Sequence, residues 1–322
     1  MRISFKQALW AAAFCGIGTS AHAECGKVTI TEMNWASGAI TTGVAKFLME
    51  QGYGCTVTVV PSSTIPAVTS VAETGEPDIL TEIWVSTVPA YKDLEKAGKI
   101  KTVAKVFSDG GEEGWWIPAY LAEEHPELKT LDGVLKNPEL VGGRFYNCPE
   151  GWGCRTRWDN LIPVYGFKEH GIEVFNPGSG ETLATAIASA YQDKKPWFGY
   201  YWGPTSILGK YPMVRVDRGP YDAAAFACAS QPVCADPKPT GDVATEVLTG
   251  ITTAFEKREP EIAKLLSNLS FTNPQMNDLL AWQEDNKAST QETTVYFLTK
   301  YKEVWKSWLS PEAAEKLAEL TK

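Results

Sequence analysis

The chain has 322 residues, which is enough for about two domains of ordinary size. Apolar residues make up 44% of it and charged residues 21%, a mixture typical of a globular protein and unlike that of a disordered or fibrous chain. Acidic residues outnumber basic ones, 39 to 30, so the composition argues against a basic nucleic-acid-binding protein and we expect no nucleic-acid partner.

The first 23 residues have the layout of a cleavable secretory signal peptide. Arg2 and Lys6 precede a short apolar stretch, and Ala21-His22-Ala23 places small residues at the two positions that signal peptidase favours. Cleavage after residue 23 removes two basic residues and leaves a net charge of 28 − 39 = −11. No later segment has the ~18 consecutive apolar residues of a membrane-spanning helix. We therefore expect an exported protein, free in the periplasm.

From residue 24 the pattern alternates short apolar strands with amphipathic helices, at about 30 residues per unit. Strands are predicted over residues 27–33, 55–60 and 78–84, and helices over residues 39–51, 65–73 and 89–97. This alternation predicts parallel strands in an α/β fold, with helices on both faces of the sheet.

A second α/β run follows an apolar segment at 114–120 that Pro118 interrupts. It has predicted strands over 143–146, 173–175, 197–202 and 211–216, and predicted helices over 156–165 and 181–192. From Asp242 to the end the pattern is helical. We therefore predict a signal peptide (1–23), the first part of lobe I (24–117), lobe II (118–209) and a return to lobe I (210–322).

The cysteines indicate disulfide bonds rather than a metal site. Of the seven cysteines, Cys15 leaves with the signal peptide, and the even number that remains in an exported chain indicates disulfides. Six cysteines allow 15 pairings, but the spacing suggests one set: Cys25–Cys55, Cys148–Cys154 and Cys228–Cys234. Metal binding by Cys148 and Cys154 is the alternative, but the chain has no CxxC motif and few histidines. We predict no metal and no cofactor.

The sequence lacks the motifs of common catalytic sites. It has no GxSxG elbow, no P-loop, no GxGxxG after a strand and no HExxH. After the signal peptide the only histidines are His125 and His170, and both lie in polar segments typical of a solvated surface. We therefore predict that the protein is not an enzyme. An exported α/β hydrolase or transferase is the alternative outside the binding proteins.

Tryptophan is the most informative residue type. In a protein of two α/β lobes, a ligand binds between the lobes, at the carboxyl ends of the strands. Trp35, Trp84 and Trp202 follow or end predicted strands, and Trp152 lies in a glycine-rich turn. Core packing is the alternative for each of them singly, but four together at the predicted cleft favour an aromatic ligand box. An amino-acid or sugar site would need more polar side chains.

Such a box suits a quaternary ammonium group, which carries diffuse positive charge and donates no hydrogen bond. Each ring face that contacts the cation contributes about 0.5–2 kcal/mol when desolvated, so a buried carboxylate is not needed. The carboxylate of a betaine would need hydrogen-bond donors. The turn at Gly153-Cys154 supplies backbone N–H groups, because it opens a predicted helix, and Arg155 or Thr156 could add a donor.

Three short segments carry a recognisable combination of motifs: CPEGWGC at 148–154, DILTEIW at 78–84 and YYWGP at 200–204. With them the chain resembles the periplasmic substrate-binding proteins of glycine betaine, proline betaine and choline ABC transporters. In that family the first segment is a disulfide-closed turn, where a cage tryptophan stands beside the amides that hold the ligand carboxylate. The other two segments resemble strand ends that carry cage tryptophans. Met33-Asn34-Trp35 is similar to the choline-binding branch, and Trp115 falls near that branch's further cage aromatic.

The resemblance implies a type II periplasmic-binding-protein fold whose two lobes close on a ligand in the cleft between them. It implies a site composed of Trp35, Trp84, Trp115, Trp152, Gly153, Cys154 and Trp202. It also implies delivery of a small compatible solute to an ABC transporter permease, and we expect the binding protein to be a monomer.

Two departures from the family leave the identity of the ligand open. Arg155 stands where the family often has an acidic residue, and Val88 stands where some betaine-binding members have a histidine. The candidates are glycine betaine, proline betaine, choline, carnitine, trimethylamine N-oxide and dimethylsulfoniopropionate.

Overall fold

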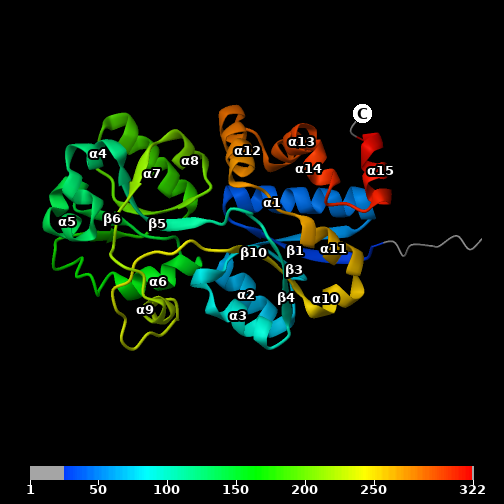
Figure 1. The fold of residues 1–322 in the computed structure, drawn as a ribbon, viewed down its shortest axis with the longest axis horizontal. Coiled ribbons are helices and arrows are strands. Elements are labelled where there is room, and N and C mark those ends of the chain that lie inside the picture. The colour runs from blue at the N-terminus through cyan, green and yellow to red at the C-terminus, as the bar shows by residue number, and fades with distance from the viewer. Residues whose placement is uncertain (1–24, 321–322) are drawn as a thin grey trace, which may run out of the picture.

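The computed structural model describes residues 25–320, which form two α/β lobes side by side (Figure 1). The predicted signal peptide, residues 1–23, lies outside the described residues. Lobe I has the strands β1 (Lys27–Met33), β2 (Thr56–Ser62), β3 (Ile79–Trp84), β4 (Ile100–Lys105) and β10 (Val247–Thr252). Lobe II has β5 (Glu112–Pro118), β6 (Arg144–Tyr146), β7 (Glu173–Phe175), β8 (Gly199–Gly203) and β9 (Met213–Arg215). The predicted two-lobed α/β fold is confirmed.

The sheet of lobe I has the strand order β2-β1-β3-β10-β4. Its helices are α1 (Ala36–Phe47), α2 (Thr64–Thr74), α3 (Pro89–Lys96), α10 (Thr253–Arg258), α11 (Pro260–Asn268), α12 (Asn273–Asn286), α13 (Thr290–Lys300), α14 (Lys302–Lys306) and α15 (Pro311–Leu320). Helix α1 covers one face of the sheet, with α12 to α15 beyond it, and α2 and α3 cover the other face (Figure 1). A short π-helical segment, Leu48–Gly52, continues α1.

The sheet of lobe II has the order β7-β6-β8-β5-β9. Its helices are α4 (Ala119–Glu124), α5 (Leu131–Lys136), α6 (Gly153–Leu161), α7 (Gly180–Asp193), α8 (Ser206–Lys210) and α9 (Ala223–Ala229). Local capping explains where several of them begin. The hydroxyl groups of Ser179 and Thr205, for example, accept hydrogen bonds from the first turns of α7 and α8.

Two strands correct the predicted boundaries between the lobes. Strand β5 lies between β8 and β9, so the chain has entered lobe II before Glu112, and the boundary at residue 117 is wrong. Strand β10 lies between β3 and β4, so the return to lobe I comes near Val247 and not at residue 210. The six residues of β10 are all buried, and the prediction of a wholly helical chain after Asp242 is therefore wrong too.

The same two strands make both sheets mixed rather than purely parallel. Strand β10 runs antiparallel to β3 and β4, and β5 runs antiparallel to β8 and β9. Each enters its sheet from the other lobe, which reverses its direction relative to the local βαβ units. The two connecting segments pair at Gly111 and Thr245, whose backbones exchange hydrogen bonds of 2.9 and 3.0 Å. This pair joins the lobes next to the cleft, because a Cβ on Gly111 would overlap the ring of Trp84.

All three predicted disulfides are present, and each is local to one lobe. Cys25–Cys55 ties the chain just before β1 to the chain just before β2. Cys148–Cys154 closes the turn between β6 and α6, and Cys228–Cys234 closes the turn after α9.

Candidate functional site

The ends of the strands bring four tryptophans from both lobes to one place. Trp35 follows β1 and is the N-cap of α1, Trp84 ends β3, Trp152 is the N-cap of α6, and Trp202 lies near the end of β8. The ring centroids of Trp35 and Trp152 are 5.0 Å apart across the cleft, and those of Trp152 and Trp202 are 4.9 Å apart. Both pairs meet edge to face, which is a favourable geometry for aromatic rings.

A small cavity lies between these rings. Its lining residues are Trp35, Thr64, Trp84, Thr87, Glu113, Trp152, Gly153, Cys154, Tyr200 and Trp202. The structure thus brings six of the seven predicted site residues around one space. Its volume is about 20 Å³, which is room for about one water molecule. A larger group enters only when the rings or the lobes move apart.

Trp115, the seventh predicted residue, is not part of this site. Its ring is fully buried in the core of lobe II, with ring centroids of Phe145, Trp158 and Phe167 at 4.8, 5.2 and 5.2 Å. Side chains alternate along a strand, so residues two apart face the same way about 7 Å apart. The β5 residue that reaches the cleft is therefore Glu113, and Trp115 lies one layer deeper in lobe II.

The turn before α6 presents backbone N–H groups to the cavity. Helix α6 begins at Gly153, and the first N–H groups of a helix have no partner within it. Neither Gly153 nor Cys154 donates its N–H to another described residue. Gly153 packs closely on lobe I, because an added Cβ would lie 2.8 Å from Val88 Cγ2 and 2.9 Å from the Thr87 carbonyl oxygen. Any larger residue here would push the lobes apart.

Arg155 does not add a donor to the cavity. Its Nε–H points to Asp159 on the same helix, at 2.8 Å from both carboxylate oxygens. Arg155 is also absent from the residues that line the cavity. Thr64 instead contributes a hydroxyl group from lobe I, which makes no hydrogen bond to the described residues.

Glu113 is a cavity residue that the sequence analysis missed. The Tyr200 hydroxyl donates to its Oε1 at 2.9 Å, and Arg157 Nη2 lies 3.5 Å from its Oε2. Burial raises the pKa of Glu113, and the charge of Arg157 opposes that rise. Arg157 is itself 2% exposed and stacks on Trp158, 4.2 Å from the ring centroid. A carboxylate with its own counter-ion therefore forms part of the lobe II wall.

Glu82 is a second carboxylate beside the tryptophans, and it is completely buried. Its Oε1 accepts hydrogen bonds from Trp35 Nε1 at 2.5 Å and from Ser37 Oγ at 2.7 Å. Burial raises the pKa of Glu82 to about 7. A cation cage does not need a buried carboxylate, but the structure places one on each side of this cage. The only sequence signal was an acidic residue inside each apolar strand pattern, ILTEIW and EEGWWIP.

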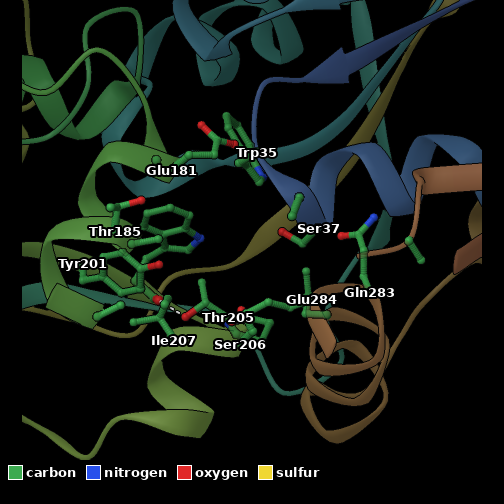
Figure 2. A pocket seen from close by; sticks show the side chains of 18 of the residues that line it. Trp35, Ser37, Glu181, Thr185, Tyr201, Thr205, Ser206, Ile207, Gln283 and Glu284 are labelled. Atoms are coloured by element: carbon green, nitrogen blue, oxygen red, sulfur yellow. Dashed lines mark hydrogen bonds between the residues drawn. The ribbon is translucent and has the colours of Figure 1, made fainter. Parts of the chain in front are cut away.

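A wider groove of about 580 Å³ adjoins the cage (Figure 2). It shares Trp35 and Trp202 with the cage and runs between the start of α1, helices α7 and α8, and helix α12. Lys210 of α8 bridges the lobes near this groove, with Nζ 2.9 Å from Glu284 and 2.7 Å from Asp285 of α12. The groove is therefore part of the cleft, and an ion pair at the surface joins its lobe II side to its lobe I side.

Within residues 25–320, no group of three or more potential ligands is placed to bind a metal ion. No helix among these residues combines the length and the apolar character needed to cross a bilayer.

The sequence profile of one family matches residues 26–300: the substrate-binding domain of ABC-type glycine betaine transport systems. Among solved structures, an ABC-transporter choline-binding protein in complex with choline is similar, with a TM-score of 0.76, 16% identity, and coverage of 92% of this chain and 99% of that chain. The glycine betaine and L-proline-binding protein of Borrelia burgdorferi has a TM-score of 0.74 and 16% identity, with coverage of 90% of this chain and 99% of that chain. Lactococcal OpuAC, in its closed conformation with glycine betaine, has a TM-score of 0.69 and 19% identity, with coverage of 88% of this chain and 100% of that chain. At these identities the likeness establishes the two-lobed fold.

Proposed function

The chain belongs to the family of substrate-binding domains of ABC-type glycine betaine transport systems, and we propose on that premise that it captures a betaine-type solute in the tryptophan cage. It is a transport protein, not an enzyme. Delivery of the solute to a membrane permease follows from the family. The three disulfides support our further proposals of a periplasmic location and a signal peptide at residues 1–23. We also propose a monomer, since the cage is complete within one chain.

One observation carries the proposal for the ammonium group: rings from different lobes converge on one cavity. Trp35 and Trp84 come from lobe I, and Trp152 and Trp202 come from lobe II. A trimethylammonium group between them would touch several ring faces, each contributing about 0.5–2 kcal/mol. Because both lobes supply rings, the cation would also stabilise the closed arrangement of the lobes.

The carboxylate of a betaine would lie toward the start of α6. The free N–H groups of Gly153 and Cys154 are good partners for an anion, and the helix dipole adds to the attraction. Both residues line the same cavity as the tryptophans, as does Thr64 with its hydroxyl group. The arrangement therefore supports a short zwitterion with its two charges at opposite ends of one small space.

A cation without a carboxylate, such as choline, is the second candidate. Glu113 lines the cavity, and a negative side chain there favours a ligand with net positive charge over a zwitterion. The ion pair between Glu113 and Arg157 offsets part of that field.

The proposal is tested by calorimetric titration of the refolded, ligand-stripped protein with glycine betaine, choline and trimethylamine N-oxide. Each is paired with its tert-butyl isostere, in which carbon replaces the positively charged nitrogen and the shape is kept. Saturable binding of at least one methylated ammonium compound, with its isostere at least about tenfold weaker, is the expected result. Equal binding of the isostere, or no binding of any compound, would refute a cation cage.

A further inference from the structure

We propose that Glu82 is a positioning residue of the cage, whose carboxylate holds the indole ring of Trp35 in place at the ligand site. This inference rests on the proposed function for its consequence in binding, but not for its geometry. Glu82 Oε1 accepts from the indole Nε1 of Trp35 and from the Ser37 hydroxyl, which lies in the first turn of α1. One oxygen atom of β3 thus fixes both the ring that follows β1 and the start of the helix behind it.

Ordinary core packing does not account for an acidic side chain at this place. Glu82 is 0% exposed, and no described residue donates a well-formed hydrogen bond to its Oε2. A buried acceptor without a donor is unfavourable, because it has given up its hydrogen bonds to water and gained none in return. The backbone of Glu82 also has φ of 53°, in the left-handed region, where the pairing of β3 with β10 shifts register between Leu80 and Ile83 in a β-bulge. Unfavourable features of this kind persist where the surroundings require them, and they cluster at functional sites.

The carboxylate serves Trp35 better when it is ionised, because hydrogen bonds to a charged acceptor are shorter and stronger than neutral ones. Burial is the largest cause that raises the pKa of Glu82 to about 7, and the hydrogen bonds from Ser37 and Trp35 oppose it. The charge on Glu82 therefore changes across neutral pH. Because the pKa in the folded protein is above the ordinary 4.5, the free energy of unfolding decreases as pH rises from about 4.5 toward 7. Over the same range the hydrogen bond from Trp35 to Glu82 becomes stronger, since its acceptor becomes charged.

Few other titrating groups surround Glu82. The elements packed on β3 carry Lys27 and Glu32 on β1, Lys46 on α1 and Glu73 on α2, and β10 carries none. Lys46 is engaged with the Val57 carbonyl oxygen and with Glu50, on the far part of α1. Glu113 is the remaining group, since it lines the cage from lobe II. A pH effect on binding must therefore be separated between Glu82 and Glu113.

The first test compares affinity for glycine betaine and choline about 1.5 pH units below and above that pKa, in the native protein and in Glu82→Gln and Glu113→Gln. Native affinity should rise about fivefold with pH, because a charged acceptor replaces a neutral one. In Glu113→Gln the affinity should still rise with pH. In Glu82→Gln the affinity should be the same at both pH values, so its loss relative to the native protein should be largest at the higher pH. The same rise in Glu82→Gln, or a deficit that is equal at both pH values, would overturn the proposal.

The second test needs no ligand and uses the NMR signal of the Trp35 indole N–H, assigned by its loss in Trp35→Phe. In the native protein this signal should titrate with a midpoint at about pH 7, and in Glu82→Gln it should not titrate. Ser37→Ala removes one donor and leaves the carboxylate, so the midpoint should move upward. A Trp35 signal that does not respond to pH, or an unmoved midpoint in Ser37→Ala, would overturn the role of Glu82. If this titration holds but no methylated ammonium compound binds, the proposed function fails and the role of Glu82 stands.

Discussion

The two halves of the cage stabilise buried carboxylates in different ways. On the lobe I side, Glu82 lies beside Trp35 among hydroxyl and indole donors, and burial raises its pKa to about 7. On the lobe II side, Glu113 lies beside Tyr200 and is paired with the buried guanidinium of Arg157. The lobe I half thus contains a carboxylate whose pKa is about 7, whereas the lobe II half contains an ion pair whose guanidinium stacks on the ring of Trp158.

The two lobes also differ in the charged groups that lie behind the cage rings. Arg157 stacks on Trp158 and Phe226, and Arg218 stacks on Trp115 and Trp158 and pairs with Asp242. These charges build the interior of lobe II under the cage. Among residues 25–320, no stacked guanidinium lies behind Trp35, where one carboxylate oxygen holds the ring. Lobe II therefore supports its half of the cage with paired charges stacked on rings, whereas lobe I supports Trp35 with a carboxylate whose pKa is about 7.

The largest expected effect comes from breaking the ion pair under lobe II with Arg157→Met. Removal of one partner leaves a buried charge uncompensated, so the free energy of unfolding should fall by about 3–5 kcal/mol at neutral pH. The pKa of Glu113, already raised by burial, rises further without Arg157, so the loss should shrink as pH falls and Glu113 is protonated. Urea unfolding at two pH values measures it, with Arg157→Met/Glu113→Gln as the control that recovers stability. A loss that does not depend on pH would mean that Glu113 is not the group left unpaired.

The next largest effect is on ligand affinity, when one cage tryptophan is removed from either lobe. Trp84→Ala in lobe I and Trp202→Ala in lobe II should each weaken ligand binding at least about tenfold, or ~1.4 kcal/mol, while the protein stays folded. Trp282→Ala is the matched control, since that ring stacks on Tyr296 in lobe I, away from the cage. Calorimetry measures the affinities. Unchanged binding in both cage variants would reduce the rings to ordinary core packing.

A smaller loss should follow from Gly153→Ala, which tests the contact between the halves. The new methyl group would meet the backbone of Thr87 at 2.9 Å, so the lobes could not approach as closely. Overpacking of this kind costs about 1 kcal/mol or more, which predicts about fivefold weaker binding. Gly178→Ala is the control, because an added Cβ there meets nothing within 4 Å. Equal affinities for the two variants would show that the close approach at Gly153 is not needed for binding.

The smallest effect is expected at the edge of the groove. Lys210→Ala removes the bridge from α8 to Glu284 and Asp285 of α12. Exposed ion pairs contribute about 0.2–1 kcal/mol, so binding should weaken less than about fivefold, and added salt should abolish the difference. Lys195→Ala, which breaks a pair within lobe II, should have no effect on affinity. A change above tenfold would make this bridge a principal latch between the lobes.

Much of this arrangement could be predicted because each feature has a local signal. Strands β1 and β7 have the predicted bounds, and the positions of Trp35, Trp84, Trp152 and Trp202 follow from where strands and a turn end. The lobe boundaries could not be predicted, because an apolar strand such as β5 carries no mark of the sheet that it joins. Strand β10 pairs with strands more than a hundred residues earlier, and that pairing is not visible in its own six residues.

The two carboxylates escaped prediction for a different reason. An acidic residue within an apolar strand pattern is ordinarily placed at the solvent side, since burial of a charge is costly unless it is paired. Glu113 is buried because Arg157 comes to it from α6, and Glu82 because Trp35 and Ser37 come to it from the end of β1 and the start of α1. These partners are 44 to 47 residues away in sequence, so only the fold brings them together. Trp115 was placed in the cage by the resemblance to the choline-binding branch, and the alternation along β5 could not correct this, because it fixes a face but not a depth.

The most direct test of the cage is a crystal structure of the protein with glycine betaine or, if it binds more tightly, choline. The account predicts the methylated nitrogen within about 6 Å of the ring centroids of tryptophans from both lobes, among Trp35, Trp84, Trp152 and Trp202. The rings of Trp35 and Trp152, now 5.0 Å apart, would have separated to admit it. A ligand bound elsewhere, for example in the groove beside α12 with the rings still in contact, would contradict the account.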